Sequence, residues 1–215
     1  MKFGKKTYGG GRPVYTSSPL RVTGGFSLDT TAQGFNAGDI IPAGTLAVYD
    51  ELTRKVKVLK TGKVKAIDEG DAKIVTLESS MHLRPIFKIG DQVLKTVTGL
   101  LASAPSITAI TIGADNGEYV ITLSAAITGL AVGNVIVQVV ADATTPTNAA
   151  LVGTANAAVI APVEVNEGTN ETGIDVTIDS GAGAWYVRRI PPILGTLMTG
   201  NVLLANHNIK FTQSY

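Results

Sequence analysis

The sequence predicts an all-β protein with a barrel-like or sandwich-like body, and three observations carry that prediction. Val, Ile, Leu, Ala and Thr are abundant and 24 glycines interrupt them, a mixture that favours short strands joined by tight turns. Several segments alternate apolar and polar side chains, as a strand with one solvated face does. A turn motif, glycine followed by Asp or Asn and then by apolar residues, recurs four times. At 215 residues the chain can form one β domain or two small ones, with a sizeable core.

The turn motif lies at residues 38–41, 90–94, 133–137 and 200–204. Glycine permits a positive φ, the Asp or Asn side chain bonds the local backbone, and the following residues start a strand. The spacings of 52, 43 and 67 residues are irregular. The motif therefore predicts a repeated kind of turn and does not predict a solenoid.

Alternation and β-branched content predict the other strands in order along the chain. These lie at residues 45–50, 55–60, 63–67, 73–79, 84–88, 107–112, 119–123, 135–141, 152–159, 173–178, 184–189 and 209–212. Residues 141–163 are expected to form a loop with a short helix. Basic and apolar side chains alternate over 53–60 and again at Lys63 and Lys65, so we expect one positively charged sheet face. A solvated edge protected by lysine and a face that binds phosphate or acidic groups both explain it.

Charge divides the chain into three parts. Residues 1–95 carry 15 basic and 9 acidic groups, residues 96–187 carry 8 acidic groups and no basic one, and residues 188–215 carry 3 basic groups and no acidic one. Opposite charges on one small protein suit ordered assembly on a charged protein surface. The uncharged strands of the middle part imply burial on both faces, which favours cover by neighbouring subunits.

The N-terminal segment, residues 1–22, is basic and rich in glycine and proline. Residues 1–22 contain five basic and three aromatic residues, and no acidic residue occurs before Asp29. The glycine run 9–11, Pro13 and Pro19 oppose regular structure. A solvated, disordered terminus is one interpretation. We favour the other, an arm that becomes ordered on a partner through its aromatic and arginine side chains. No apolar run follows the first lysine, so a secretory signal is not expected, and neither is a membrane partner.

The sequence offers few residues for catalysis or metal binding. It has no cysteine, and His82 and His207 lie in predicted turns, apart from any metal-ligand or nucleophile motif. Glu164, Glu167 and Glu171 share a polar loop but lack the EF-hand spacing. We therefore expect no enzyme, no catalytic residue, no metal and no other cofactor. The net charge of +1 argues against a nucleic-acid partner.

Three stretches, residues 37–50, 121–135 and 203–211, resemble the head fibre or auxiliary capsid (decoration) proteins of tailed phages of gut Bacteroidales. More loosely, they are similar to decoration proteins with a β-tulip fold. The resemblance implies a non-enzymatic virion protein on the outer capsid surface, assembled in the host bacterial cytoplasm and often a homotrimer. It also implies an N-terminal grip on the major capsid protein. That capsid-binding role falls here on Lys2, Phe3, Lys5, Lys6, Tyr8, Arg12, Val14 and Tyr15.

With this resemblance, the predicted organisation has three parts. An extended basic arm (1–22) precedes a barrel-like body built from 23–100 and 186–215, and residues 101–185 form a low-charge β subdomain or trimer-core segment. The alternative function is a β-sandwich adhesin or carbohydrate-binding module of a phage fibre, which allows a host-surface glycan at the distal end. Such sites need exposed aromatic platforms, and the chain has only six tyrosines and one tryptophan. Trp185 is expected to be a core or interface anchor.

Overall fold

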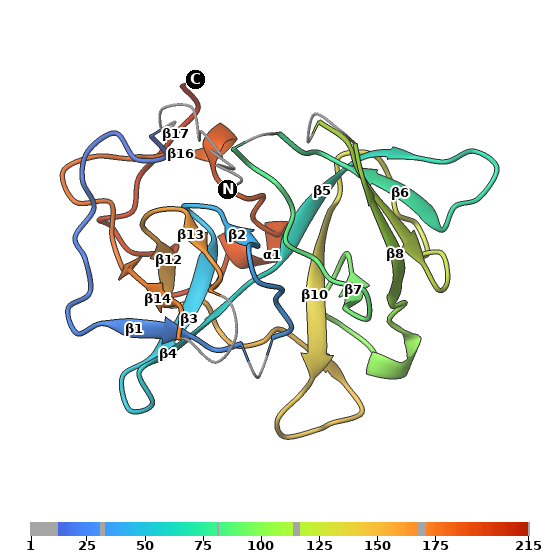
Figure 1. The fold of residues 1–215 in the computed structure, drawn as a ribbon, viewed down its shortest axis with the longest axis horizontal. Helices are drawn as coiled ribbons and strands as arrows, with labels where there is room; N and C mark the ends of the chain where they lie inside the picture. Colours follow the sequence, from blue (N-terminus) through green and yellow to red (C-terminus); the bar gives the residue numbers. More distant parts are fainter. Residues whose placement is uncertain (1–12, 31–32, 81, 114–116, 167–170, 215) are drawn as a thin grey trace, which may run out of the picture.

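The computed structural model describes residues 13–30, 33–80, 82–113, 117–166 and 171–214, and it is nearly all β (Figure 1). Most strands belong to two sheets, one of six strands and one of seven. The six-stranded sheet lies on the left of Figure 1 and the seven-stranded sheet on the right. The prediction of an all-β, barrel-like or sandwich-like body is confirmed.

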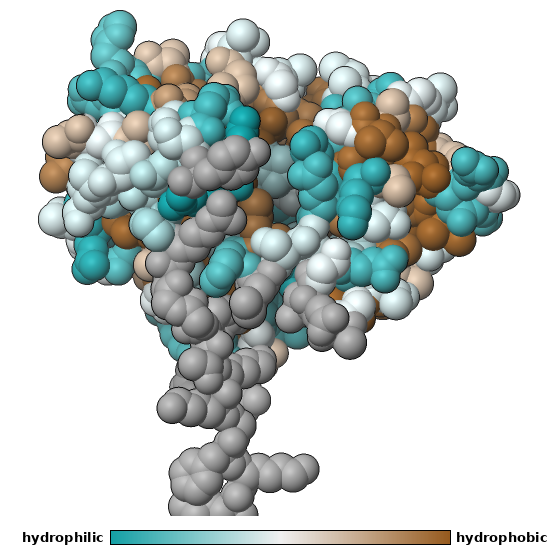
Figure 2. Space-filling view, turned by 90° about the horizontal axis from the view of Figure 1, so that it is seen from above, coloured by the Kyte–Doolittle hydropathy of each residue, from teal (hydrophilic) through white to brown (hydrophobic). Residues whose placement is uncertain are grey.

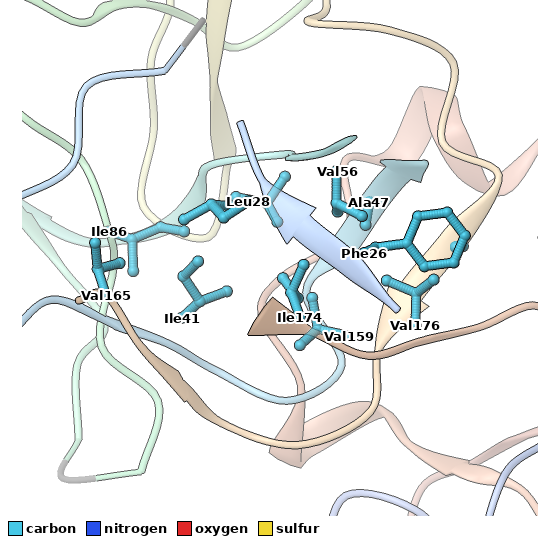
Figure 3. Packing of buried hydrophobic residues seen from close by; sticks show 12 residues of the cluster. Phe26, Leu28, Ile41, Ala47, Val56, Ile86, Val159, Val165, Ile174 and Val176 are labelled. Carbon is cyan, nitrogen blue, oxygen red and sulfur yellow. The ribbon is translucent and has the colours of Figure 1, made fainter. Parts of the chain in front are cut away.

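The six-stranded sheet takes its strands from both ends of the chain. Its order is β14 (Gly173–Ile174), β1 (Phe26–Leu28), β4 (Lys55–Val58), β3 (Leu46–Asp50), β12 (Ala157–Val159) and β15 (Val176–Thr177). β1 and β4 run parallel, and the other neighbours are antiparallel. Apolar side chains from these strands and from flanking loops form one core cluster (Figure 3). Because only Asp175 separates the two outermost strands, β14 and β15, the sheet curls towards closure.

The seven-stranded sheet is built from one continuous stretch of chain. Its path is β11 (Ala149–Ala150), β10 (Val135–Ala141), β5 (Thr61–Ile67), β6 (Ile74–Leu77), β9 (Tyr119–Leu123) and β8 (Ile107–Ile112), and β7 (Gln92–Leu94) pairs with β10. Residues next to β7 also bond the start of β8, where Ile107 N donates to Asp91 O at 2.9 Å. The circuit therefore returns through β7 to β10 and encloses a second core cluster.

Short elements complete the fold. β2 (Ile40–Ile41) pairs antiparallel with β13 (Val163–Glu164), whereas β16 (Trp185–Tyr186) pairs parallel with β17 (Phe211–Thr212). The helical elements are the 3-10 turns η1 (Leu101–Ser103) and η2 (Val187–Arg189) and the one-turn helix α1 (Gly195–Met198).

The turn motif forms as predicted at three of its four positions. All four glycines have positive φ, at 80°, 95°, 86° and 82° along the chain. In the first three turns, the Asp or Asn side chain accepts a bond from the N–H three residues earlier, over 2.6, 2.8 and 3.0 Å. Strands β2, β7 and β10 then begin at the next residue. At Asn201 the side chain instead accepts from Leu203 N at 3.0 Å, and the chain continues as a turn.

Several predicted segments differ from the structure. The strands predicted at 152–159 and 184–189 form only over 157–159 and 185–186, and residues 187–189 form the turn η2. Residues 84–88 form no strand, because Pro85 has no N–H group to donate to a neighbouring strand. The side chains of Ile86 and Phe87 enter the cores of different sheets. No strand forms at 200–204, where the adjacent residues Leu203 and Leu204 enter the same core, which a two-residue period forbids. Residues 141–163 hold β11 and β12 and no helix.

The sheets divide the chain at other positions than the three-part organisation expected. The seven-stranded sheet draws on residues 61–150, and the six-stranded sheet on 26–58 and 157–177. Segment 101–185 is therefore shared: its strand β9 pairs with β6, and its strand β12 pairs with β3. The predicted lysine face is also divided, because β4 and β5 belong to different sheets.

A buried ion pair joins the two sheets where the chain passes from β4 to β5. Lys60 is fully buried, and its Nζ lies 3.0 Å from Asp91 Oδ2 and donates to Gly34 O, also at 3.0 Å. The same ammonium group lies 4.7 Å from the centroid of the Phe35 ring. Desolvation lowers the pKa of Lys60, and the Asp91 carboxylate opposes that shift. The alternating pattern of residues 53–60 predicted a solvated Lys60, and that prediction is wrong.

Two glutamines extend this polar network into both sheets. Gln138 in β10 donates to Asp91 Oδ1 at 2.8 Å, and Gln33 donates to Gln138 Oε1 at 3.1 Å. Gln33 also donates to Val58 O and accepts from Val58 N, both at 2.7 Å. Buried polar networks stabilise a fold when their members are hydrogen-bonded, as these are. The network therefore fixes the loop around residue 34 against β4 on one side and β10 on the other.

We predict that Lys60→Met lowers the free energy of unfolding by about 3–5 kcal/mol, because it leaves the Asp91 carboxylate buried without its cation. The matched control is Lys73→Met. Lys73 pairs with Asp71 over 3.5 Å, and the two side chains are 46% and 41% exposed. This control should change stability by less than about 1 kcal/mol. Urea denaturation followed by circular dichroism measures both, and equal losses would contradict the role given to Lys60.

Candidate functional site

The described part of the N-terminal segment, residues 13–22, packs on the body. Tyr15 is 8% exposed, and its ring meets Trp185 edge-on, with the centroids 5.8 Å apart. Its hydroxyl donates to Val159 O at 2.6 Å. Thr16 N donates to Ala184 O, and Tyr186 N donates to Val14 O, both at 2.9 Å. For these residues, the expectation of an arm that extends from the body is wrong.

Further contacts hold the second half of this segment. Arg21 forms a β-bridge with Thr177, and Val22 N donates to Val176 O at 2.9 Å. The Arg21 guanidinium also lies 3.3 Å from Asp175 Oδ2. Residues 21–22 thus pair with β15 before the chain enters β1. The glycines and prolines of this segment suggested disorder. The residues that pair with it lie more than 150 residues away in sequence, so no local pattern indicated the pairing.

The residues to which the sequence assigned capsid binding divide into two groups. Val14 is half-buried against the Trp185 cluster and Tyr15 is buried in it, so the Tyr15 side chain holds the segment and is not available to a partner. The others lie outside the described residues: Lys2, Phe3, Lys5, Lys6, Tyr8 and Arg12.

An aromatic cluster holds Tyr15, near the described start of the chain, on the body. Trp185 is fully buried, and its ring packs edge-on against Tyr15 and Phe211, each with centroids 5.8 Å apart. The cluster confirms Trp185 as a core anchor. Arg189 closes it at the surface, where the guanidinium lies 4.1 Å from the centroid of Tyr186 and donates to Pro13 O at 3.0 Å.

A groove of about 550 Å³ opens beside this cluster. One wall comes from the seven-stranded sheet and includes Thr61 and Val135. The other comes from the C-terminal segment 187–213 and includes Arg188 and Phe211, which also belongs to the aromatic cluster. The space-filling view looks onto the molecule from above and shows hydrophobic surface beside hydrophilic side chains on the seven-stranded side (Figure 2). No sequence motif marks the groove, because its lining combines residues as far apart in sequence as Thr61 and Gln213.

The described residues contain no further candidate site of the kinds considered next, and the comparisons with known proteins identify no relative. The described residues contain no cluster of three or more His, Cys, Asp or Glu that could bind a metal ion. His82 and His207 are exposed. In the same residues, no helix has the length and apolar character needed to cross a bilayer. The chain matches no family model, no curated protein and no solved structure.

We predict that Tyr15→Phe reduces the loss of stability at alkaline pH. Burial raises the pKa of Tyr15. In the unfolded chain Tyr15 ionises near pH ~10, whereas the folded protein keeps its proton, so the free energy of unfolding falls above that pH. The variant still loses some stability at alkaline pH, because burial also raises the pKa of Tyr119.

The same variant should cost about 1 kcal/mol at neutral pH, because one buried hydrogen bond is removed. Val159 O still accepts from Gly44 N, so no carbonyl is left unpaired. Urea denaturation at about pH 7 and about pH 11 measures both effects. An alkaline slope identical to that of the parent would refute the burial of the Tyr15 hydroxyl.

Proposed function

We propose that this protein is a virion structural protein that decorates or cements the outer surface of a phage capsid, with its N-terminal segment bound to the major capsid protein. The observation that carries the proposal is that Tyr15 fixes this segment to the body, and we call the stretch 13–15 the root. Tyr15 is buried between Trp185 and Val159, so the residues before Pro13 start from a rigid point on the body. If residues 1–12 act as a tether to the capsid, a force on them must be transmitted to the folded core, and the buried Tyr15 provides that connection.

Charge supports the same proposal. The residues before the root include Lys2, Lys5, Lys6 and Arg12 and no acidic residue, which suits an acidic capsid surface. Arg188 and Arg189 lie beside the root and continue the positive charge onto the body. Binding of many copies to the assembled shell alone would stabilise that shell by linkage.

The exposed edge of β8 supports self-association, which we propose as a homotrimer. Ile107 is bonded to residues 90–91, but beyond it the described residues give this strand no backbone partner on the side away from β9. The strand Ile107–Ile112 contains no charge and no proline. A bulge near its start is the only device there that normally protects an edge from pairing. A neighbouring copy can therefore add a strand to it.

We predict that deletion of residues 2–12 strongly lowers occupancy on capsids assembled without this protein, because the root remains but the tether is gone. A second variant replaces Lys2, Lys5, Lys6 and Arg12 by Gln, and its charge-matched control replaces Lys57, Lys65, Lys73 and Lys210. Co-sedimentation with capsids measures occupancy. Unchanged occupancy after the deletion would contradict the tether. Binding on a glycan array without capsid binding would instead support the adhesin.

We also predict that Thr111→Lys weakens self-association at least about threefold, because a lysine on an exposed strand edge opposes pairing with a strand of another copy. Thr111 is exposed on β8. Thr76→Lys is the control, since Thr76 lies in β6, with β9 between it and β8. Sedimentation velocity over a concentration series measures the oligomer. A parent that stays monomeric, or equal effects of the two variants, would contradict association through β8.

A further inference from the structure

Much of the lining of the groove beside the N-terminal root is apolar. Its apolar residues include Leu83, Val135, Pro191, Pro192, Met198 and Phe211. Met198 is 47% exposed, so part of this apolar surface faces solvent. Burial of such surface against apolar side chains of a ligand is favourable at roughly 25 cal/mol per Å². This apolar lining therefore favours a ligand with apolar side chains over a fully polar one.

One wall has the backbone chemistry that suits an extended peptide. Pro191 and Pro192 have no N–H group, so they present only carbonyl acceptors. Neither carbonyl accepts a backbone hydrogen bond from the described residues. An extended segment carries N–H groups at regular intervals along its length and can donate to such acceptors. This wall is thus suited to a strand-like ligand.

The lining of the groove carries more basic than acidic groups. Lys63 and Glu78 lie 2.8 Å apart and offset each other. Arg84 and Arg188 also line the groove, and both are exposed. The Arg84 guanidinium lies 5.9 Å from the centroid of Tyr119, and it forms no ion pair with a carboxylate of the described residues. A ligand that matches this charge carries Asp or Glu.

The chain's own N-terminal residues do not match the groove. Residues 1–12 carry four basic groups and no acidic one, so they would be repelled by Arg84. These residues therefore lack the charge that complements the groove.

We propose that the groove binds an extended segment of the major capsid protein in which Asp or Glu residues accompany apolar ones. The identity of this partner rests on the proposed function, whereas the acidic and apolar character follows from the groove itself. The N-terminal root and the groove share Phe211 and open side by side. Two contacts to one shell are then linked, and the second forms at a high effective concentration.

Three substitutions test the groove. Arg84→Glu should weaken binding about tenfold, because an attraction becomes a repulsion. Glu78→Gln should strengthen it several-fold, because Lys63 loses its internal partner. Lys73→Glu, on an exposed lysine that does not line the groove, is the charge-matched control and should have little effect.

Two probes separate the groove from the proposed function. The first is capsids that lack this protein, and the second is a fluorescent synthetic hexapeptide of alternating glutamate and valine, followed by anisotropy. Equal affinities of Arg84→Glu and Lys73→Glu for both probes would overturn the groove. If the parent bound hexaglutamate as tightly as the glutamate–valine peptide, the proposed apolar contribution of the groove would be overturned. Binding of the peptide through Arg84 without any binding to capsids would overturn the capsid protein as partner, while the chemistry of the groove would stand.

Discussion

The buried contact between Lys60 and Asp91 is the constraint on which the arrangement of the two sheets depends. It lies where the chain leaves β4 for β5, and Gln33 and Gln138 extend it into both sheets. Charges in such a site are stable only with their partners in place, so the network permits one relative placement of the sheets. One wall of the groove belongs to the seven-stranded sheet. The other wall, the C-terminal segment, packs through Trp185 on residues of the six-stranded sheet. The width of the groove thus follows from this contact.

The aromatic cluster around Trp185 connects the two parts of the proposed capsid-binding face. Tyr15 in this cluster holds the N-terminal segment, and Phe211 both packs on Trp185 and lines the groove. A pull on the N-terminal residues is therefore carried into the core beside the groove. In this account, tether and groove bind the shell as one unit, and the remaining surface, including the edge of β8, is left for neighbouring copies.

Local patterns predicted local structure, and long-range contacts decided the rest. The strands β8, β9 and β10 have the predicted bounds, because alternation and turn residues are read within ten residues. Lys60 was misjudged, since alternation shows that a strand has two faces but not that a second sheet covers the lysine. Tyr15 was misjudged for a similar reason: its hydrogen-bond acceptor, Val159 O, lies 144 residues away. The groove combines segments equally distant in sequence, so no local pattern could predict it.

Electron cryo-microscopy of phage capsids saturated with the full-length protein tests the central claim most directly. The account predicts density for the body on the outer shell, with the aromatic cluster and the groove facing the capsid protein. A segment of that protein should occupy the groove. Bare capsids, or a body that turns this face towards solvent, would contradict it.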